Sequence, residues 1–236
     1  MIKQAMILAA GFGKRINPLT LQKPKPLLQI GNTTLLANTL KFLSAHGIER
    51  VVINVHYLAD QIIDYIDKNN FNLEIVVSNE KNKILDTGGG ILNVIKSFSK
   101  DPLVVINPDT IWNTNYLKEL DLIEKFFKNN KNIKCLILVV NKEKSLDKSF
   151  KGDFSLKSNK ISKKINCLDY IYTGLQVVQP KIFSDYKENI FSMNKVWDDL
   201  IINNELYGIE SNIEFLHVSN LKIYEEILKK TNTQNI

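Results

Sequence analysis

The sequence predicts an α/β fold built on a mainly parallel sheet with helices on both sides. Two features of the chain indicate this class. Through the first 140 residues, short continuous apolar runs alternate with longer amphipathic stretches, which is typical of βαβ units whose strands are buried on both faces. Beyond residue 140 the chain becomes polar and lysine-rich and then contains short β-like pieces. This change predicts a β-rich subregion appended to the sheet.

Five apolar runs in the first part are predicted to be strands, namely 5–10, 51–54, 73–77, 103–106 and 135–140. They do not alternate polar with apolar residues, so each fits a strand that is covered on both faces. Right-handed crossovers between such strands give a Rossmann-like sheet.

Helices are predicted between these strands because apolar residues recur there every three or four positions. The residues that share a helical face are Leu36, Leu40 and Leu43 in one segment and Leu58, Ile62 and Ile66 in the next. Two further helices are predicted over 90–98 and 116–127.

The later part of the chain is predicted to contain, in order, short β pieces near 154–156, a strand over 170–178, a helix over 195–203 and a last short strand over 214–218. Asn220 is suited to cap a final helix over 221–230, because its side chain accepts hydrogen bonds from free N–H groups of a first turn. We expect one domain over residues 1–236, in which about 141–236 forms a substrate-side part.

The composition excludes several classes of protein. The 236 residues are 44% hydrophobic and 24% charged, which is unlike collagen, extended disorder or a disulfide-stapled scaffold. Cys135 and Cys167 are too few for a disulfide framework, and Cys135 opens an apolar run, so we expect it in the core. The N-terminal apolar stretch is too short for a signal sequence, and no run approaches ~18 apolar residues. We expect a cytoplasmic protein.

The charge balance of 31 Lys+Arg against 25 Asp+Glu leaves a net charge of +6. This surplus suggests an anionic partner, such as a nucleic acid, an anionic lipid or a phosphorylated metabolite. Arginine occurs only at positions 15 and 50, and the lysines are dispersed. Because nucleic-acid-binding proteins more often cluster arginine with aromatic residues, that class is disfavoured. Most of the lysines are expected to be solvated surface.

A glycine-rich loop, Ala-Ala-Gly-Phe-Gly-Lys-Arg over 9–15, follows the first predicted strand. Ligands of open α/β sheets bind beyond the carboxyl ends of the strands. Gly11 and Gly13 permit a tight turn whose N–H groups point at phosphate oxygens. The guanidinium of Arg15 can grip a phosphate through two hydrogen bonds. Lys25 can add a point charge, since it stands in a Lys-Pro-Lys-Pro segment whose prolines stiffen the backbone.

Two commoner phosphate-binding patterns do not fit this loop. A Walker A loop needs glycine where Leu8 stands and serine or threonine where Arg15 stands, and a dinucleotide fingerprint needs a third glycine where Ile16 stands. An ordinary βα turn is the structural alternative for an isolated Gly-x-Gly. The combination with Arg15 and the Lys-Pro-Lys-Pro segment favours a phosphate site.

These motifs together resemble the signature of the sugar-nucleotide pyrophosphorylases, which are nucleoside-triphosphate:sugar-1-phosphate nucleotidyltransferases. The resemblance extends over nearly the whole chain, through Asp-Thr-Gly-Gly-Gly-Ile at 86–91, Lys-Gly-Asp-Phe at 151–154 and Tyr-Thr-Gly-Leu-Gln-Val at 172–177. It is strongest to the N-acetylmuramate-1-phosphate uridylyltransferase branch. The resemblance implies a nucleotide-diphospho-sugar transferase fold, transfer of a nucleotide from UTP to a sugar 1-phosphate with release of pyrophosphate, and a place in peptidoglycan recycling.

The resemblance also implies roles for individual residues. Arg15, Lys25 and Asp109 are the expected catalytic residues. The expected nucleotide-binding residues are Leu8, Ala10, Gly11, Phe12, Gly13, Thr87, Gly88 and Asn107, all within the first part of about 1–140. The expected sugar-binding residues are Gly152, Asp153, Thr173 and Gly174. The structural alternatives are a flexible helix entry at the glycines of 88–90 and a polar turn at 152–153.

Asp109 lies just past the predicted strand 103–106 and is the expected ligand of Mg²⁺, with Mn²⁺ as the alternative, because these cations prefer carboxylate oxygens. A turn or helix cap is the structural alternative. The chain departs from the family pattern at two positions. Pro108 stands where the family usually has glycine, and His217 stands where it often has a second metal-binding aspartate. An imidazole suits Zn²⁺ or Mn²⁺ better than Mg²⁺.

Three roles for His217 remain open: it coordinates the metal, it contacts a metal-bound water or a phosphate, or it has no catalytic role. Asp198 and Asp199 offer a substitute carboxylate, although a charge pair at the start of a helix is the simpler interpretation.

The two departures also leave room for a regulatory protein that binds nucleotides without turnover. Among enzymes, the alternative is a mannose-1-phosphate guanylyltransferase or another NTP:sugar-1-phosphate transferase. The expected partners are a nucleoside triphosphate and a sugar 1-phosphate, without nucleic acid or membrane, and the expected assembly is a monomer or a small homo-oligomer.

Overall fold

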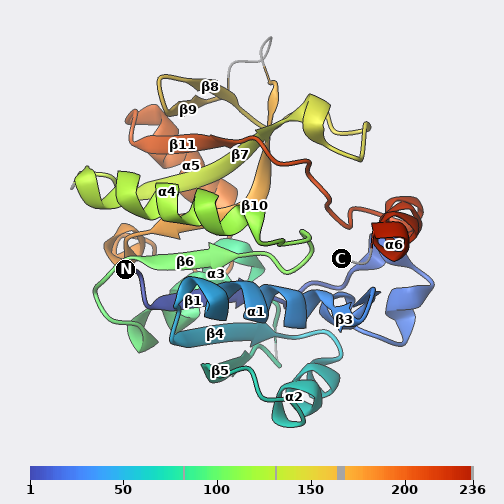
Figure 1. Cartoon of the computed structure of the whole chain (residues 1–236). Coiled ribbons are helices and arrows are strands. Elements are labelled where there is room, and N and C mark those ends of the chain that lie inside the picture. Colours follow the sequence, from blue (N-terminus) through green and yellow to red (C-terminus); the bar gives the residue numbers. More distant parts are fainter. Residues whose placement is uncertain (82, 131, 164–167, 235–236) are drawn as a thin grey trace.

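One sheet runs through the molecule and determines where the predicted site loops lie (Figure 1). The computed structural model describes residues 1–81, 83–130, 132–163 and 168–234. The strands are β1 Gln4–Leu8, β2 Gln29–Ile30, β3 Thr33–Thr34, β4 Arg50–Val55, β5 Glu74–Asn79, β6 Leu103–Ile106, β7 Cys135–Asn141, β8 Ser155–Lys157, β9 Lys160–Ser162, β10 Tyr170–Val178 and β11 Leu206–Ser211. Within these residues, nine strands are joined in the order β5-β4-β1-β6-β10-β7-β11-β9-β8, and β2 pairs separately with β3.

Most strands of this sheet run in the same direction, and β10 and β9 run opposite to the others. β4 pairs in parallel with both β1 and β5, and β6 pairs in parallel with β1. β10 then runs antiparallel between β6 and β7, and β11 returns to a parallel pairing with β7. The hairpin of β8 and β9 extends the far edge. The prediction of a mainly parallel sheet with a β-rich subregion is confirmed.

Helices cover both faces of the sheet. They are α1 Leu35–His46, α2 Ala59–Asp67, α3 Asp86–Val94, α4 Asn115–Asn129, α5 Met193–Ile202 and α6 Leu221–Gln234. α1, α2 and α4 pack on the face of the sheet to which the side chain of Ile7 points. In Figure 1, α1 and α4 lie in front of the sheet. α3 and α5 pack on the opposite face, to which the side chain of Met6 points. Because successive residues of a strand point to opposite faces, β1 is buried on both sides from Gln4 to Ile7, as its apolar run predicts.

Local sequence explains the ends of two helices near the site. Thr34 caps α1 by accepting a hydrogen bond from the N–H of Ala37 at 3.1 Å, and Gly47 ends the helix with a φ of +92° that favours glycine. Asn220 caps α6 by accepting from the N–H of Ile223 at 3.1 Å, which confirms the prediction. α6 packs on Ile16 and so covers the loop that follows β1.

One predicted strand is wrong, and the bounds of several other predicted elements differ from the structure. Residues 214–218 form only isolated bridges, between Ser145 and Phe215 and between Thr110 and His217. The strand in this region is β11. It was not predicted, because its sequence, Leu-Tyr-Gly-Ile-Glu-Ser, mixes polar residues and glycine with the apolar ones. Gly208 is required there, because a Cβ would lie 2.5 Å from Cδ1 of Ile161. The strand predicted over 5–10 ends at Leu8, and the helix predicted over 90–98 is α3, which begins and ends four residues earlier.

Two expectations from composition can be compared with the structure. Cys135 is fully buried in β7, which confirms a core thiol, whereas Cys167 lies outside the described residues. In the described ranges of the chain, no helix has both the length and the apolarity that a membrane crossing requires.

Candidate active site

A cavity of about 350 Å³ opens where β1 and β6 end, at the edge to which parallel strands deliver their loops. We name it the glycine-loop cavity. The predicted residues that line it are Leu8, Ala10, Gly11, Gly13, Arg15, Lys25, Thr87, Asn107 and Asp109. The polar lining residues that were not predicted are Lys14, Asn54, Asp86 and Ser219. The site therefore gathers segments from loops that are far apart in the sequence.

The two glycines of the loop have different surroundings. Gly13 has a φ of +65°, and a Cβ there would lie 3.1 Å from both Cβ of Lys25 and Cγ2 of Thr20, so the fold itself requires glycine. The hydroxyl of Thr20 donates to the backbone oxygen of Gly13 at 2.9 Å and closes the turn. A Cβ on Gly11 would meet no atom of the described chain within 4 Å. The backbone of Gly11 is thus left open to a ligand.

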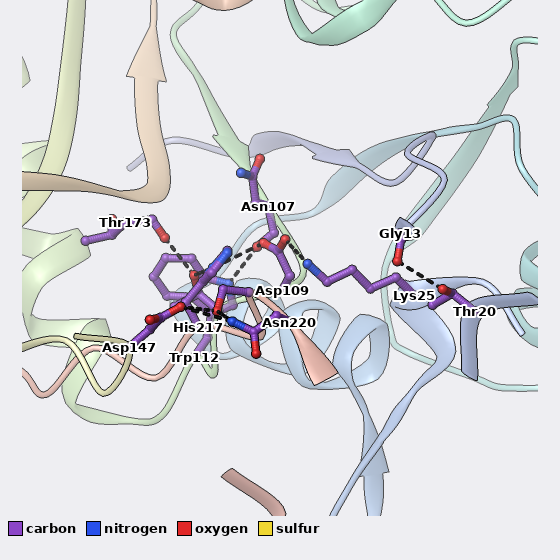
Figure 2. A network of polar contacts seen from close by, with 12 residues as sticks. Gly13, Thr20, Lys25, Asn107, Asp109, Trp112, Asp147, Thr173, His217 and Asn220 are labelled. Carbon is purple, nitrogen blue, oxygen red and sulfur yellow. Dashed lines mark hydrogen bonds and ion pairs between the residues drawn. The ribbon is translucent and has the colours of Figure 1, made fainter. Parts of the chain in front are cut away.

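Lys25 and Asp109 meet across this cavity (Figure 2). Nζ of Lys25 lies 2.5 Å from Oδ2 of Asp109. The second carboxylate oxygen, Oδ1, is buried, has no hydrogen-bond partner among the described residues, and lies 3.6 Å from Nδ1 of His217. Burial alone raises the pKa of Asp109, but the neighbouring His217 and Lys25 outweigh burial and lower this pKa from 3.8 to about 2. Asp109 is therefore ionised at neutral pH.

His217 reaches Asp109 through backbone pairing of their two segments. His217 and Thr110 form a bridge, and the N–H of Val218 donates to the backbone oxygen of Asp109 at 2.8 Å. Burial lowers the pKa of His217 from 6.5 to about 4, and the cations Lys25 and Arg15 act in the same direction. The imidazole is therefore neutral at pH 7, and Lys25 is the cation that acts on Asp109 there.

Asp147 is a buried carboxylate of the site that was not predicted. It accepts hydrogen bonds from the hydroxyls of Ser219, at 2.5 Å, and Ser149, at 2.6 Å, and Nδ2 of Asn220 lies 3.4 Å away (Figure 2). These bonds anchor the segment 217–220, which carries His217, against the loop after β7. No motif marks Asp147, because it lies in the polar, lysine-rich stretch, where aspartate is usually a surface residue.

Asn54, at the end of β4, is a second residue that was not predicted. Its Oδ1 accepts from the N–H of Ala9 at 2.9 Å, and its Nδ2 donates to Oε1 of buried Glu80 at 2.8 Å. The other oxygen of Glu80 accepts from the N–H of Leu85 at 2.9 Å. Asn54 and Glu80 therefore fix the start of the glycine-rich loop relative to the start of α3.

A second cavity of about 380 Å³ lies beside the first, and we name it the aromatic cavity. Its lining residues are Phe150, Asp153, Phe154, Lys163, Ile171, Tyr172, Asn194, Trp197, Phe215 and His217. Oδ2 of the predicted Asp153 accepts from the N–H of Tyr172 at 3.0 Å. Because His217 lines this cavity and Asp109 lines the other, the two cavities meet at the Asp109–His217 contact.

Gly152, Thr173 and Gly174, predicted to bind sugar, line neither cavity in the described part of the chain. A Cβ on Gly152 would lie 2.0 Å from the backbone oxygen of Leu168, so its turn requires glycine. The hydroxyl of Thr173 donates to the backbone oxygen of Leu138, and the backbone oxygen of Gly174 accepts from the N–H of Asn107. These residues support the site through contacts within the protein. A direct contact with the sugar remains a prediction.

Phe12 and Gly88, predicted to bind nucleotide, also lie outside the lining of the glycine-loop cavity as described. Phe12 packs against the rings of His56 and Tyr57, at 5.6 and 5.5 Å between centroids. A Cβ on Gly88 would lie 2.4 Å from the ring of Phe191. Gly88 and Gly89 therefore admit the protein segment 189–191, and Gly90 admits the side chains of Asn54 and Glu80. Contact with a base remains a prediction for Gly88.

Asp198 and Asp199 are engaged at the surface of α5. Asp198 pairs with Lys163 at 2.6 Å, and Asp199 accepts from the hydroxyl of Tyr186 at 2.6 Å. Neither lines a cavity with Asp109 in the described chain. The structure therefore favours a surface role for these two residues, but they lie in the middle of α5, so their predicted place at the start of a helix is wrong.

The potential metal ligands form two separate groups. In the site, Oδ1 of Asp109 fits a divalent cation, since it is a buried carboxylate oxygen without a described hydrogen-bond partner. Elsewhere, His46 lies with Asp121 and Glu124, and the ligand atoms of all three are within 4.8 Å of one another. The ammonium of Met1 is already 3.0 Å from Glu124, and His46 stands in the last turn of α1, so this second group is an ion-pair cluster.

Comparison with known proteins identifies the family of the chain. The sequence profile described as nucleotidyl transferase matches residues 4–148, more than half of the chain. The chain belongs to the nucleotidyl transferase family. This membership confirms the resemblance and the prediction of a sugar-1-phosphate nucleotidyltransferase.

Individual relatives extend the match. An N-acetylmuramate alpha-1-phosphate uridylyltransferase of Caulobacter vibrioides is 29% identical over 222 residues, covering 92% of this chain and 91% of that protein. A mannose-1-phosphate guanyltransferase of Aspergillus oryzae is 36% identical over 112 residues, which are 46% of this chain and 30% of that protein. The crystal structure of HddC from Yersinia pseudotuberculosis shares the fold with a TM-score of 0.76 and 24% identity, over 97% of this chain and 99% of that one.

Proposed function

We propose that this nucleotidyltransferase joins UTP to N-acetylmuramate 1-phosphate, giving a UDP-sugar and pyrophosphate. The observation that carries the proposal is the place of the Lys25–Asp109 pair, where the glycine-loop cavity meets the aromatic cavity at His217. Transfer of a nucleotide from one substrate to the other requires charged groups at the place where the two substrates meet. The choice of UTP and of this sugar is supported by the Caulobacter vibrioides relative, which matches over most of both chains.

The two cavities divide the substrates between them in this proposal. The nucleotide occupies the glycine-loop cavity, formed mainly by residues of about 1–140, and the sugar phosphate occupies the aromatic cavity, formed mainly by about 141–236. Aromatic rings suit the apolar faces of a sugar ring. Lys163, at the rim of the aromatic cavity, suits the carboxylate that distinguishes muramate from neutral sugars.

The reaction in this arrangement is an in-line displacement at phosphorus. An oxygen of the sugar phosphate attacks the α-phosphorus of UTP, and the bond from that phosphorus to the departing pyrophosphate breaks. The phosphate nucleophile is already anionic, so the reaction needs positioning and charge neutralisation rather than a base. The N–H groups of the loop at Gly11 and Gly13, with the guanidinium of Arg15, hold the β- and γ-phosphates. Lys25 stabilises the charge that develops at the α-phosphate.

A divalent cation, Mg²⁺ or Mn²⁺, belongs to this proposal. Asp109 would hold it through Oδ1, and the ion would supply further neutralisation of phosphate charge. Lys25 holds the carboxylate of Asp109 ionised and oriented by its contact with Oδ2. The enzyme is proposed to work in the cytoplasm, where nucleoside triphosphates are made, and to serve peptidoglycan recycling.

The test is a screen for pyrophosphate release. UTP, GTP, CTP and ATP are each combined with the 1-phosphates of N-acetylmuramate, N-acetylglucosamine, glucose and mannose, with Mg²⁺ and with Mn²⁺. We expect the highest kcat/KM for UTP with N-acetylmuramate 1-phosphate. Asp109→Asn should lower kcat by about 10²-fold or more. Near-normal turnover by this variant would contradict the proposed site.

A second candidate is a mannose-1-phosphate guanylyltransferase. It is favoured by the 36% identity to the Aspergillus oryzae protein, although that match covers only 46% of this chain. A preference for GTP and mannose 1-phosphate in the screen would select it. Tight nucleotide binding without turnover for any pair would instead select the regulatory protein.

A further inference from the structure

The two nitrogens of the His217 ring face different surroundings. Nδ1 is turned toward protein atoms, at 3.3 Å from Oγ1 of Thr110 and 3.6 Å from Oδ1 of Asp109. The ring edge that lines the aromatic cavity is therefore the edge that carries Nε2. Among the described residues, no hydrogen bond to Nε2 is formed.

The hydroxyl of Thr110 decides which ring nitrogen carries the hydrogen. Its oxygen lies 2.7 Å from the backbone oxygen of Thr173, which only accepts, so the one hydroxyl hydrogen is used in that contact. Toward Nδ1 of His217 this hydroxyl can therefore only accept, and the carboxylate of Asp109 is an acceptor as well. Two acceptors beside Nδ1 place the ring hydrogen on that atom and leave the lone pair on Nε2.

The ring of His217 is also fixed in orientation. It stacks on the ring of Phe215, with centroids 5.5 Å apart and planes 19° apart, and Phe150 meets it edge-on at 6.0 Å. Both phenylalanines line the aromatic cavity. A ring held between two others cannot easily turn to exchange the places of its nitrogens, so the lone pair of Nε2 stays directed to the cavity.

We propose that His217 is a specificity-determining residue for the sugar and not a ligand of the metal. Nε2 accepts a hydrogen bond from a hydroxyl or an amide N–H of the bound sugar, and the divalent cation is left to Asp109. This inference rests on the proposed function, because it assumes that the aromatic cavity holds the sugar phosphate.

Two substitutions of His217 distinguish the role of Nδ1 from the role of Nε2. The amide of asparagine reaches about as far as Nδ1, and the amide of glutamine reaches about as far as Nε2. His217→Gln can still accept a hydrogen bond from the sugar, whereas His217→Asn keeps only the group that faces Thr110 and Asp109. We expect His217→Asn to raise the KM of the sugar 1-phosphate by about tenfold. For His217→Gln we expect that KM to change by less than about threefold, and for both variants an unchanged KM of the nucleotide.

The second measurement is Mn²⁺ binding in the presence of UTP, followed by electron paramagnetic resonance without any sugar. Both variants should bind Mn²⁺ as the unaltered protein does. Loss of Mn²⁺ affinity in either variant would assign a ring nitrogen to the metal and overturn the proposal, with loss only in His217→Asn indicating Nε2 and loss only in His217→Gln indicating Nδ1. Equal KM values of the sugar 1-phosphate in both variants would also overturn it.

Analogues of the sugar 1-phosphate that each lack one hydroxyl or the amide N–H test the same contact without changing the fold. One analogue should raise the KM of the unaltered protein by about tenfold and cause no further rise in His217→Asn. If every analogue has the same effect on both proteins, the sugar contact is excluded. Failure of the proposed function has a different signature, since the unaltered protein would then release no pyrophosphate with any sugar 1-phosphate of the screen.

Discussion

Nζ of Lys25 lies 2.5 Å from Oδ2 of Asp109, although 84 positions separate the two residues in the chain. Their side chains are only 13% and 19% exposed, so water screens this pair less than it screens a surface ion pair. The contact joins the Lys-Pro-Lys-Pro segment after β1 to the loop after β6. It therefore fixes the spacing of two walls of the glycine-loop cavity as well as the charge of Asp109.

Replacing Lys25 by alanine should lower kcat by about 10²-fold or more, because a positioned cation beside the reacting phosphate is removed. Steady-state pyrophosphate release with the best substrate pair measures the effect. Lys23→Ala is the matched control, since Lys23 stands two residues away, is exposed and does not line the described cavity. An equal loss in both variants would indicate a general effect of charge and would contradict a specific role of Lys25.

The two glycines of the phosphate loop should respond differently to alanine. A methyl group on Gly11 meets no described atom within 4 Å, so Gly11→Ala should leave the melting temperature unchanged and raise the KM of the nucleotide. Gly13→Ala should destabilise the protein by about 1–2 kcal/mol, because its φ of +65° is unfavourable for alanine. Thermal denaturation and nucleotide titration distinguish the two. A nucleotide KM that Gly11→Ala does not change would exclude this loop from the phosphate site.

The stability of the protein should fall as the pH decreases from about 6.5 to about 4. Burial lowers the pKa of His217 from 6.5 to about 4, so in this window the unfolded chain binds a proton at His217 that the folded protein does not bind. This contribution is complete above pH 6.5 and is worth up to about 3 kcal/mol. Urea denaturation across the window measures it.

His217→Gln should flatten this pH profile, because glutamine does not titrate. In the unaltered protein the pKa of Asp109 is lowered from 3.8 to about 2, so its contribution is lost only below that window. His217→Gln removes one of the groups that lower this pKa, so Asp109→Asn in the same background is the control for that carboxylate. Identical profiles for the variant and the unaltered protein would show that His217 is not the residue responsible.

Lys163 should distinguish acidic from neutral sugars. It lines the aromatic cavity, where its Nζ lies 2.6 Å from Oδ1 of Asp198. Lys163→Gln should raise the KM of N-acetylmuramate 1-phosphate by about tenfold through loss of a charged hydrogen bond. The KM of N-acetylglucosamine 1-phosphate, which lacks the carboxylate, should not change. Lys157→Gln, an exposed position on the neighbouring β8, is the control.

The phosphate side of the site could be predicted because its information is local. Gly11, Gly13 and Arg15 lie within five residues, and their order after an apolar strand indicates a phosphate loop without knowledge of the fold. The strands and helices of the first part were predictable for the same reason, since each apolar period is contained in one short segment.

Other parts of the site could not be predicted, because their role depends on distant partners. Asp147 matters through Ser219, 72 residues away, and nothing in its own neighbourhood indicates this contact. The glycines at 88–90 suggest close approach of another group, but the groups that approach are the segment that contains Phe191, at Gly88 and Gly89, and the side chains of Asn54 and Glu80, at Gly90. β11 was missed because Gly208, which weakens the strand pattern, is needed only for contact with Ile161.

The place of β10 in the sheet has a consequence for the order in which the molecule is completed during synthesis. β10 fills the gap between β6 and β7, yet both of those strands leave the ribosome before it does. Until residue 178 has emerged, β5, β4, β1 and β6 can pair, but β7 still lacks both of its neighbours, β10 and β11. The facing edges of β6 and β7 then have unpaired N–H and C=O groups. A fragment that stops at residue 148, where the family match ends, keeps those open edges permanently and is expected to self-associate.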